Sequence, residues 1–159
     1  FIEELINQML RDPSIKMCTP IIRSDTETFS NLLKDKNNNR VGATTVVFDR
    51  NKYALYFSKE VIPHANLQNT NPDLKIFHHI GVYCYKKSAL INFLEWPEGL
   101  LEKTEGLEQL RFLENGEKVK CVVVETKQQA IWELNNPADK IIIEKILGKI
   151  NAEQDNKGW

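Results

Sequence analysis

The sequence predicts a single α/β domain built on a mixed β-sheet. Segments with apolar residues at helical spacing alternate along the chain with short runs rich in β-branched and aromatic residues, as in layered α/β proteins. Two of the β-rich runs are separated by only four residues, which favours an antiparallel hairpin within the sheet. The 159 residues suffice for one domain with a sizeable core and are few for two.

The first half of the chain is expected to supply one helix and three strands. Apolar residues recur at helical spacing over residues 1–10, and Asp12-Pro13 ends this helix. Residues 23–42 are polar and broken, so a loop is expected there, most clearly at 35–39. The three β-rich runs are residues 16–22, 44–48 and 53–58, the last two joined as a hairpin by residues 49–52.

The second half is expected to begin with a long polar loop over residues 60–78, which contains Pro63 and Pro72. A helix over residues 105–114 would end at Gly116, a residue suited to a helix C-terminus. Pro137 is well placed to open a last helix. The remaining expected elements are a strand at 79–85, a helix at 88–94, a strand at 119–124, the last helix through residue 147, and a tail at 151–159 that leaves residues 1–150 as the domain.

Composition narrows the class of protein. The formal net charge is -1, which indicates neither a nucleic acid nor an anionic membrane as partner. Apolar runs fall far short of the roughly 20 residues that cross a bilayer, and no targeting segment is visible, so a cytoplasmic location is expected. Cys18, Cys84 and Cys121 lack metal-ligand spacing and are expected to be buried, reduced thiols. The chain begins at Phe1 inside an amphipathic pattern, so it is expected to continue something longer.

Two segments carry the polar chemistry. In the first, His79, Gly81, Tyr83 and Tyr85 would share one face of a strand, and Gly81 would let a ligand approach the backbone. Taken alone, this pattern is more often plain core. The second is an acidic helical segment whose carboxylates and amide fall three and four residues apart, which alone is more often a solvated face; they are Glu102, Glu105, Glu108 and Gln109.

Taken together, these segments resemble the CMP-KDO synthetases, which are 3-deoxy-manno-octulosonate cytidylyltransferases. That family has a His-Ile-Gly-aliphatic-Tyr strand, followed by Pro-Leu-Glu-x-x-Glu-x-Leu-Glu-Gln-Leu-Arg and a Glu-Asn-Gly end. The same pattern runs here from His79 to Gly116, with Leu100 in place of the leading proline. The Tyr-Ala-Leu-Tyr-Phe-Ser strand at residues 53–58, followed by Pro63, is a further family signature. The similarity extends from Phe1 to about Leu147.

The resemblance implies a Rossmann-like nucleotide-diphospho-sugar transferase fold that apparently lacks its N-terminal nucleotide-binding part. It implies a cytidylyltransferase that joins CTP to the 2-hydroxyl of 3-deoxy-manno-octulosonate for lipopolysaccharide biosynthesis, with release of pyrophosphate and with Mg²⁺ as cofactor. The hairpin would form a homodimer interface, with residues 58–63 near the sugar. Arg111 would brace the acidic helix or face an anion. The sugar-acid pocket would be lined by His79, Tyr83, Glu102, Glu105 and Gln109.

Three departures from the family pattern bear on the site. The family's N-terminal phosphate-gripping loop and its Gln-Gly-Asp segment have no counterpart in these residues. The position of a metal-binding aspartate aligns with Asn135, a weaker Mg²⁺ ligand for which Glu133 is a possible substitute. Lys59 stands where many members have arginine, so the charge is kept and the bidentate fork is lost.

Two other functions remain compatible with these residues. One is a cytidylyltransferase for another acid sugar. The other is a non-catalytic sugar-binding or dimerisation module without a CTP site, which would bind sugar or a second chain without releasing pyrophosphate. An unrelated α/β interaction domain would require several spaced motifs to coincide by chance.

Overall fold

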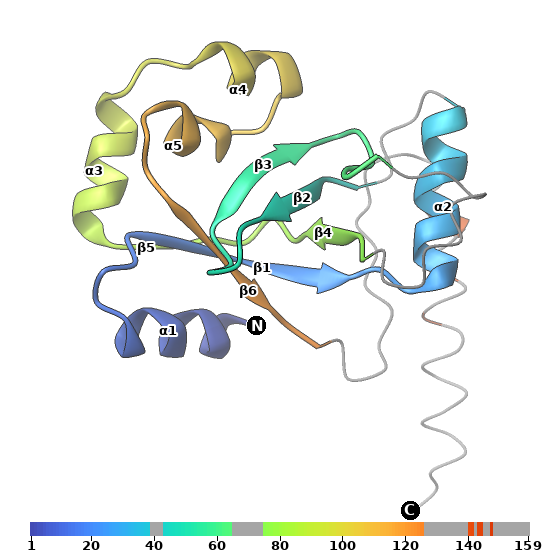
Figure 1. Cartoon of the computed structure of the whole chain (residues 1–159), viewed down its shortest axis with the longest axis horizontal. Coiled ribbons are helices and arrows are strands. Elements are labelled where there is room, and N and C mark those ends of the chain that lie inside the picture. Colours follow the sequence, from blue (N-terminus) through green and yellow to red (C-terminus); the bar gives the residue numbers. More distant parts are fainter. Residues whose placement is uncertain (39–42, 65–74, 126–139, 142, 145–146, 148–159) are drawn as a thin grey trace, which may run out of the picture.

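The computed structural model describes residues 1–38, 43–64, 75–125, 140–141, 143–144 and 147 (Figure 1). In chain order its elements are α1 (Ile2–Arg11), β1 (Met17–Arg23), α2 (Thr26–Asn37), β2 (Thr45–Phe48), β3 (Ala54–Ser58), β4 (Phe77–His79), β5 (Cys84–Tyr85), α3 (Lys87–Glu95), α4 (Leu100–Glu105), α5 (Leu110–Glu114) and β6 (Val119–Val123).

These strands form one mixed sheet, as the sequence predicts. Its order is β3-β2-β4-β1-β5, and β6 pairs with the other edge of β1. The pairing of β1 with β6 is parallel, whereas β4 and β5 are antiparallel to β1. The predicted hairpin is confirmed, because β2 and β3 are antiparallel with Thr45 opposite Ser58. The strands and helices expected at residues 1–10, 16–22, 88–94 and 119–124 are also confirmed, with ends that differ by at most one residue.

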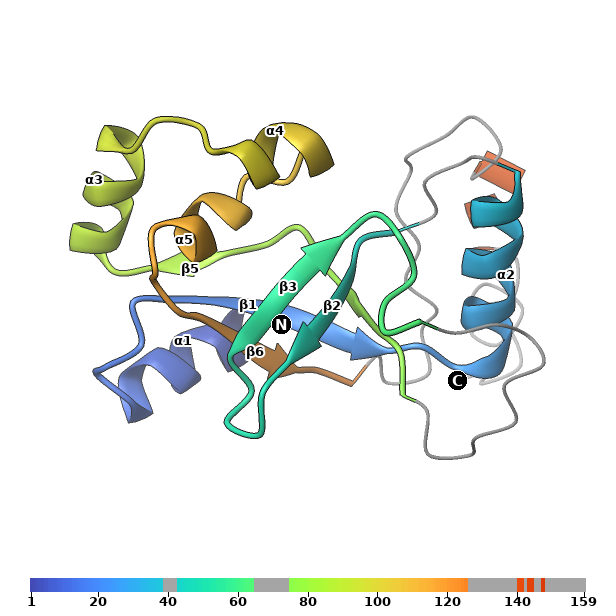
Figure 2. The same ribbon diagram turned by 45° about the horizontal axis from the view of Figure 1, so that its top comes forward.

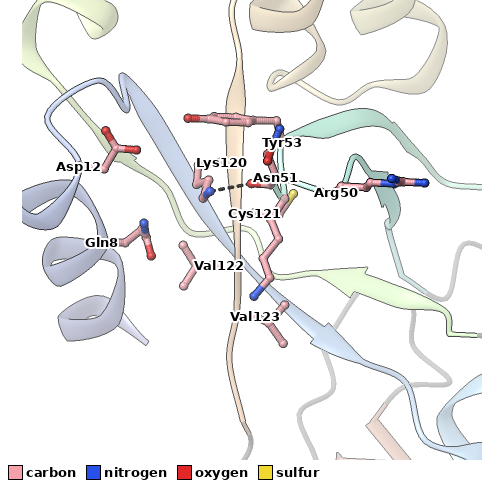
Figure 3. Close-up of a pocket in the computed structure, with 10 residues that line it drawn as sticks. Gln8, Asp12, Arg50, Asn51, Tyr53, Lys120, Cys121, Val122 and Val123 are labelled. Atoms are coloured by element: carbon pink, nitrogen blue, oxygen red, sulfur yellow. Dashed lines mark hydrogen bonds between the residues drawn. The ribbon is translucent and has the colours of Figure 1, made fainter.

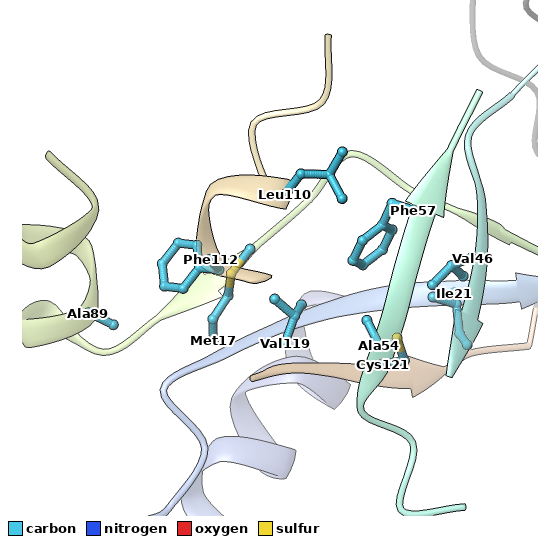
Figure 4. Packing of buried hydrophobic residues seen from close by; sticks show 10 residues of the cluster. All are labelled: Met17, Ile21, Val46, Ala54, Phe57, Ala89, Leu110, Phe112, Val119 and Cys121. Carbon is cyan, nitrogen blue, oxygen red and sulfur yellow. The ribbon is translucent and has the colours of Figure 1, made fainter. Parts of the chain in front are cut away.

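Helices cover both faces of the sheet. Figure 1 shows α1 on one side of β1 and β6, with α3, α4 and α5 on the other, and the turned view in Figure 2 keeps this separation. Alternation along β1 explains the two layers, since Met17 and Ile21 pack beneath α5 while Cys18 packs against Leu5 of α1. Figure 4 shows Phe112 and Leu110 of α5 directed at the larger of these cores.

The loop predicted over residues 23–42 is wrong over most of its length, because α2 occupies residues 26–37 and so includes part of 35–39, where the loop was expected most clearly. The side chain of Asp25 accepts a hydrogen bond from the Thr28 amide at 2.7 Å and caps the helix. Leu32 and Leu33 are buried against Val61 and Ile76. Because only a short apolar part of α2 is buried, its apolar residues do not recur at helical spacing along the whole segment, and the sequence signal for a helix is weak.

The single strand predicted at residues 79–85 is also wrong. It is divided into β4, which His79 ends rather than begins, and β5, which begins at Cys84. Ile21 is paired with His79, and Cys18 is paired with Cys84. Between these two pairs the chain advances three residues along β1 but five residues on the opposite side. The segment between β4 and β5 therefore contains two additional residues. It forms a bulge in which the Val82 amide donates to the Ile80 carbonyl at 2.6 Å. Bulges of this kind redirect side chains next to functional sites.

The single helix predicted at residues 105–114 is replaced by α4 and α5. Gly106 adopts a left-handed conformation with φ 63° and ends α4, since glycine carries no penalty there. The expected C-terminal role of Gly116 is confirmed. Its amide donates to Leu113 and the Glu117 amide donates to Phe112, the two hydrogen bonds of a Schellman motif.

The helix expected to start at Pro137 and the tail at residues 151–159 fall largely or wholly outside the described residues. Among the residues that are described, no helix has the length and apolar character needed to cross a membrane.

Candidate functional site

His79 lies at the end of β4, buried with 5% of its surface exposed. Its Nε2 lies 2.8 Å from the hydroxyl of Thr19 on the neighbouring strand β1. Burial lowers the pKa of the imidazole to about 4, and the adjacent His78 acts in the same direction. The ring is therefore neutral at pH 7 and is able both to donate and to accept one hydrogen bond.

The bulge brings Tyr83 to His79 and to the acidic segment. The rings of His79 and Tyr83 have centroids 5.4 Å apart, and those of Tyr83 and Tyr85 are 5.8 Å apart, so these three of the four residues predicted to share a face do lie side by side although the strand is broken. The Tyr83 hydroxyl donates to Gln109 Oε1 at 2.9 Å. Gln109 is 1% exposed, and its Nε2 is the buried polar side-chain atom without a hydrogen-bond partner in the described part of the chain. Such an atom is costly unless a ligand or water satisfies it.

Glu105 connects the end of α4 to the end of the β2–β3 hairpin. Its carboxylate accepts hydrogen bonds from the Ser58 hydroxyl at 2.8 Å and the Lys59 amide at 3.0 Å. A longer bond of 3.3 Å comes from the Tyr56 hydroxyl. The carboxylate thereby fixes the chain where it leaves β3, and it holds Lys59 beside Gly106.

Glu102 is paired with Arg111, which braces the acidic segment, one of its two predicted roles. Arg111 Nε and Nη2 contact the two carboxylate oxygens at 2.7 and 2.5 Å. This pairing holds the pKa of the Glu102 carboxyl below its usual value. Glu114 strengthens the same junction, because its carboxylate accepts hydrogen bonds from the Leu101 and Glu102 amides at the start of α4.

The two metal-ligand candidates, Glu133 and Asn135, lie outside the described residues. Within the described ranges, no group of three or more histidine, cysteine, aspartate or glutamate side chains could hold a metal ion.

A cavity of about 570 Å³ lies elsewhere, between α1, the β2–β3 turn and β6. Figure 3 shows Gln8 on α1, and Asp12 just after its end, facing Lys120 and Val122 on β6. The Lys120 ammonium donates to the Asn51 carbonyl at 2.7 Å and is thereby engaged within the protein. None of the predicted site residues that the structure describes lines this cavity.

Thr19 is the member of the His79 group that sequence reasoning missed. It is fully buried in β1, in the otherwise apolar run Met17-Cys18-Thr19-Pro20-Ile21-Ile22. A hydroxyl in such a run must find a hydrogen-bond partner, and this is the signal that could have singled it out. Its partner lies 60 residues away, which the sequence does not reveal.

The mixed sheet and this buried polar group define an α/β protein with a candidate ligand site, and comparison with known proteins identifies its class as the cytidylyltransferases. The chain belongs to the cytidylyltransferase family, whose model matches residues 2–119.

Among its relatives is a 3-deoxy-manno-octulosonate cytidylyltransferase of Maricaulis maris, 36% identical over 136 residues, which are 86% of this chain and 52% of the relative. The enzyme of the same name from Chloroherpeton thalassium is 41% identical over 72% of this chain and 44% of its own length. A solved CMP:2-keto-3-deoxy-manno-octonic acid synthetase complexed with CTP has a TM-score of 0.70 and 25% identity, covering 96% of this chain and 56% of that one. The expected Rossmann-like transferase fold is confirmed. The chain spans about half the length of the curated relatives it matches.

Proposed function

We propose that this chain forms the sugar-acid-binding part of a 3-deoxy-manno-octulosonate cytidylyltransferase. The enzyme would join CTP to the 2-hydroxyl of the sugar acid and release pyrophosphate, within lipopolysaccharide biosynthesis. One observation carries the proposal: residues from the two family-like motifs, 26 positions apart, meet in the hydrogen bond between Tyr83 and Gln109 beside His79. The family membership and the names of the relatives support the same reaction.

His79, Tyr83 and Gln109 are proposed to contact the sugar acid. A sugar acid presents many hydroxyls and a carboxylate, and each needs a placed partner once it is removed from water. The neutral imidazole offers the ring nitrogen that is not hydrogen-bonded to Thr19, the phenol offers a hydroxyl, and the amide Nε2 of Gln109 is a donor without a partner among the described residues. Ligand binding would satisfy that donor.

Glu102 and Glu105 are proposed to shape this pocket by holding its walls. Arg111 occupies both oxygens of Glu102, and three donors of the hairpin occupy the carboxylate of Glu105. Such engaged carboxylates position α4 against α5 and against the hairpin, which keeps the pocket rigid.

The proposed reaction brings further expectations with it. CTP is the nucleotide, and Mg²⁺ would neutralise its phosphates, with Glu133 and Asn135 as the candidate ligands in this chain. The reaction is expected to take place in the cytoplasm. A homodimer is expected to form through the β2–β3 hairpin, on which Leu55 is 62% exposed.

The decisive experiment measures pyrophosphate release from CTP and Mg²⁺ with 3-deoxy-manno-octulosonate, and in parallel with another CMP-activated acid sugar. Binding of each sugar is measured separately without CTP. Pyrophosphate release with 3-deoxy-manno-octulosonate, and not with the other sugar, supports the proposal. Release only with the other sugar indicates a different substrate. Because this chain is proposed as the sugar-acid-binding part, the measurements use the natural protein that contains this sequence, and binding without release in that protein indicates a non-catalytic module.

The site assignment is tested by replacing His79 with alanine. Loss of its hydrogen bond to a sugar hydroxyl should weaken sugar binding by about 1–3 kcal/mol. His78→Ala is the matched control, because the adjacent histidine is also buried, with 8% exposed, and its Nδ1 lies 3.2 Å from Ser24 Oγ. Equal effects of the two substitutions on sugar binding would contradict the assignment.

A further inference from the structure

The hydroxyl of Thr19 lies close to three polar atoms of the bulged segment and of the residue before it. Its Oγ1 is 2.8 Å from His79 Nε2, 2.8 Å from the Val82 carbonyl oxygen and 3.3 Å from the Ile80 carbonyl oxygen. Thr19 and Pro20 have no strand partner in β4 or β5. Where the ladder is interrupted, β1 is joined to this segment by the Thr19 hydroxyl and by the hydrogen bond from the Ile80 amide to the Pro20 carbonyl at 3.1 Å.

The number of protons available decides the direction of these hydrogen bonds. A threonine hydroxyl has one proton to donate, and a carbonyl oxygen can only accept. The proton of Thr19 is therefore used by Val82, with Ile80 as the more distant acceptor. If His79 Nε2 accepted that proton instead, the Val82 carbonyl oxygen would lie 2.8 Å from a lone pair of the Thr19 oxygen, with no proton between the two atoms. Nε2 must then be the donor and Thr19 the acceptor of the bond between them.

This direction also determines what the rest of the imidazole offers. A neutral imidazole has a single N–H, so a ring protonated at Nε2 has an acceptor lone pair at Nδ1. The rings of Phe57 and Tyr83 pack against the ring of His79, with centroids 5.2 and 5.4 Å away, and limit its rotation.

We propose that Thr19 is a positioning residue that fixes the Nε2–H tautomer of His79 and so presents Nδ1 as an acceptor for a hydroxyl of the sugar acid. The part concerning the ligand rests on the proposed function; the part concerning the tautomer does not. A residue that hydrogen-bonds one ring nitrogen of a functional histidine commonly sets the protonation of the other, which faces the ligand.

The tautomer is measured directly by the ¹⁵N chemical shifts of the His79 ring at neutral pH, assigned by their loss in His79→Gln. We expect a protonated Nε2 and an unprotonated Nδ1 in the unaltered protein and in Thr19→Ser, which keeps the hydroxyl. Thr19→Val keeps the shape and removes the hydroxyl, so it should give a mixture of both tautomers. An Nδ1–H ring in the unaltered protein, or an unchanged tautomer in Thr19→Val, would overturn the inference.

Substrate measurements test the consequence. Thr19→Val should weaken sugar-acid binding about tenfold, raising the KM for the sugar while the KM for CTP stays unchanged, and Thr19→Ser should restore it. A uniform fall in kcat with no change in sugar KM would overturn the positioning role. If the unaltered protein has the expected tautomer and binds no sugar acid, the proposed function fails while the tautomer assignment stands.

Discussion

Arg111 contacts both carboxylate oxygens of Glu102, and its guanidinium carbon lies 4.2 Å from the centroid of the Phe93 ring. Within α4 and α5, the side chains of this pair are only 10–14% exposed. A planar guanidinium is suited both to the bidentate pair and to the aromatic face. The pair therefore joins two short helices, neither long enough to be stable alone.

Replacing Arg111 with alanine should lower the free energy of unfolding by about 3 kcal/mol, because it leaves the Glu102 carboxylate buried without its partner. Urea denaturation measures this loss. Lys140→Ala is the control, since Lys140 and Glu144 form a pair at 3.8 Å in which both side chains are more than 60% exposed. That substitution should cost no more than about 0.5 kcal/mol. Equal losses would show that the buried pair contributes no more to the free energy of unfolding than the exposed pair does.

The stability of the protein should depend on His79 between about pH 6.5 and pH 4. The folded-state pKa of about 4 lies below the ordinary value of 6.5, so the unfolded chain binds a proton first as the pH falls. This contribution to stability is complete above pH 6.5 and is lost toward pH 4, by about 3 kcal/mol at most. Unfolding free energies measured across this range should fall less steeply for His79→Gln. Parallel curves for the two proteins would refute the shifted pKa.

Gly99→Ala should destabilise the start of α4. A Cβ at Gly99 would overlap the Glu114 carboxylate, which caps the Leu101 and Glu102 amides. We expect a loss of about 1–2 kcal/mol, as for removal of an N-terminal cap. Gly81→Ala serves as the control, because a Cβ there meets nothing within 4 Å. Thermal unfolding of both variants checks this, and a harmless Gly99→Ala would rule out the proposed overlap.

At most one of the three cysteines should react with a thiol reagent in the folded protein at pH 8. Burial raises the pKa of both Cys18 and Cys121 to about 12, so their reactive thiolates are scarce. Cys84 is only half-buried. Counting released chromophore should give no more than one thiol in the folded protein and three after denaturation, with Cys84→Ser removing the first. Reaction of two or three thiols without unfolding would contradict the burial of β1 and β6.

Periodicity and turn chemistry were sufficient for most of the fold. The helix at the start of the chain, the hairpin and the last strand follow from local patterns that tertiary contacts reinforce. Where the prediction failed, contacts distant in sequence determined the structure. The helix α2 depends on burial of Leu32 and Leu33 against Val61 and Ile76. The single helix predicted over residues 105–114 includes Gly106, but the left-handed conformation of this residue divides α4 from α5.

The candidate site was predictable as a set of motifs and not as a set of contacts. His79, Tyr83 and Gln109 do come together. The sequence left two roles open to Arg111. Arg111 and Glu102 are nine residues apart and a helix break lies between them, so their spacing does not determine whether the two side chains meet. Thr19 was missed because its role depends on a strand 60 residues later in the chain.

The interruption of the sheet beside Thr19 and Pro20 has an evolutionary consequence. Proline at position 20 accepts a hydrogen bond from the Ile80 amide at 3.1 Å but cannot donate one, and the hydroxyl of Thr19 supplies the donor to the segment opposite β1. The two positions should therefore vary together. Relatives that retain the proline and the bulge should carry threonine or serine at the preceding position, and those that lose the hydroxyl should also restore an ordinary strand there, with a different side chain in place of His79.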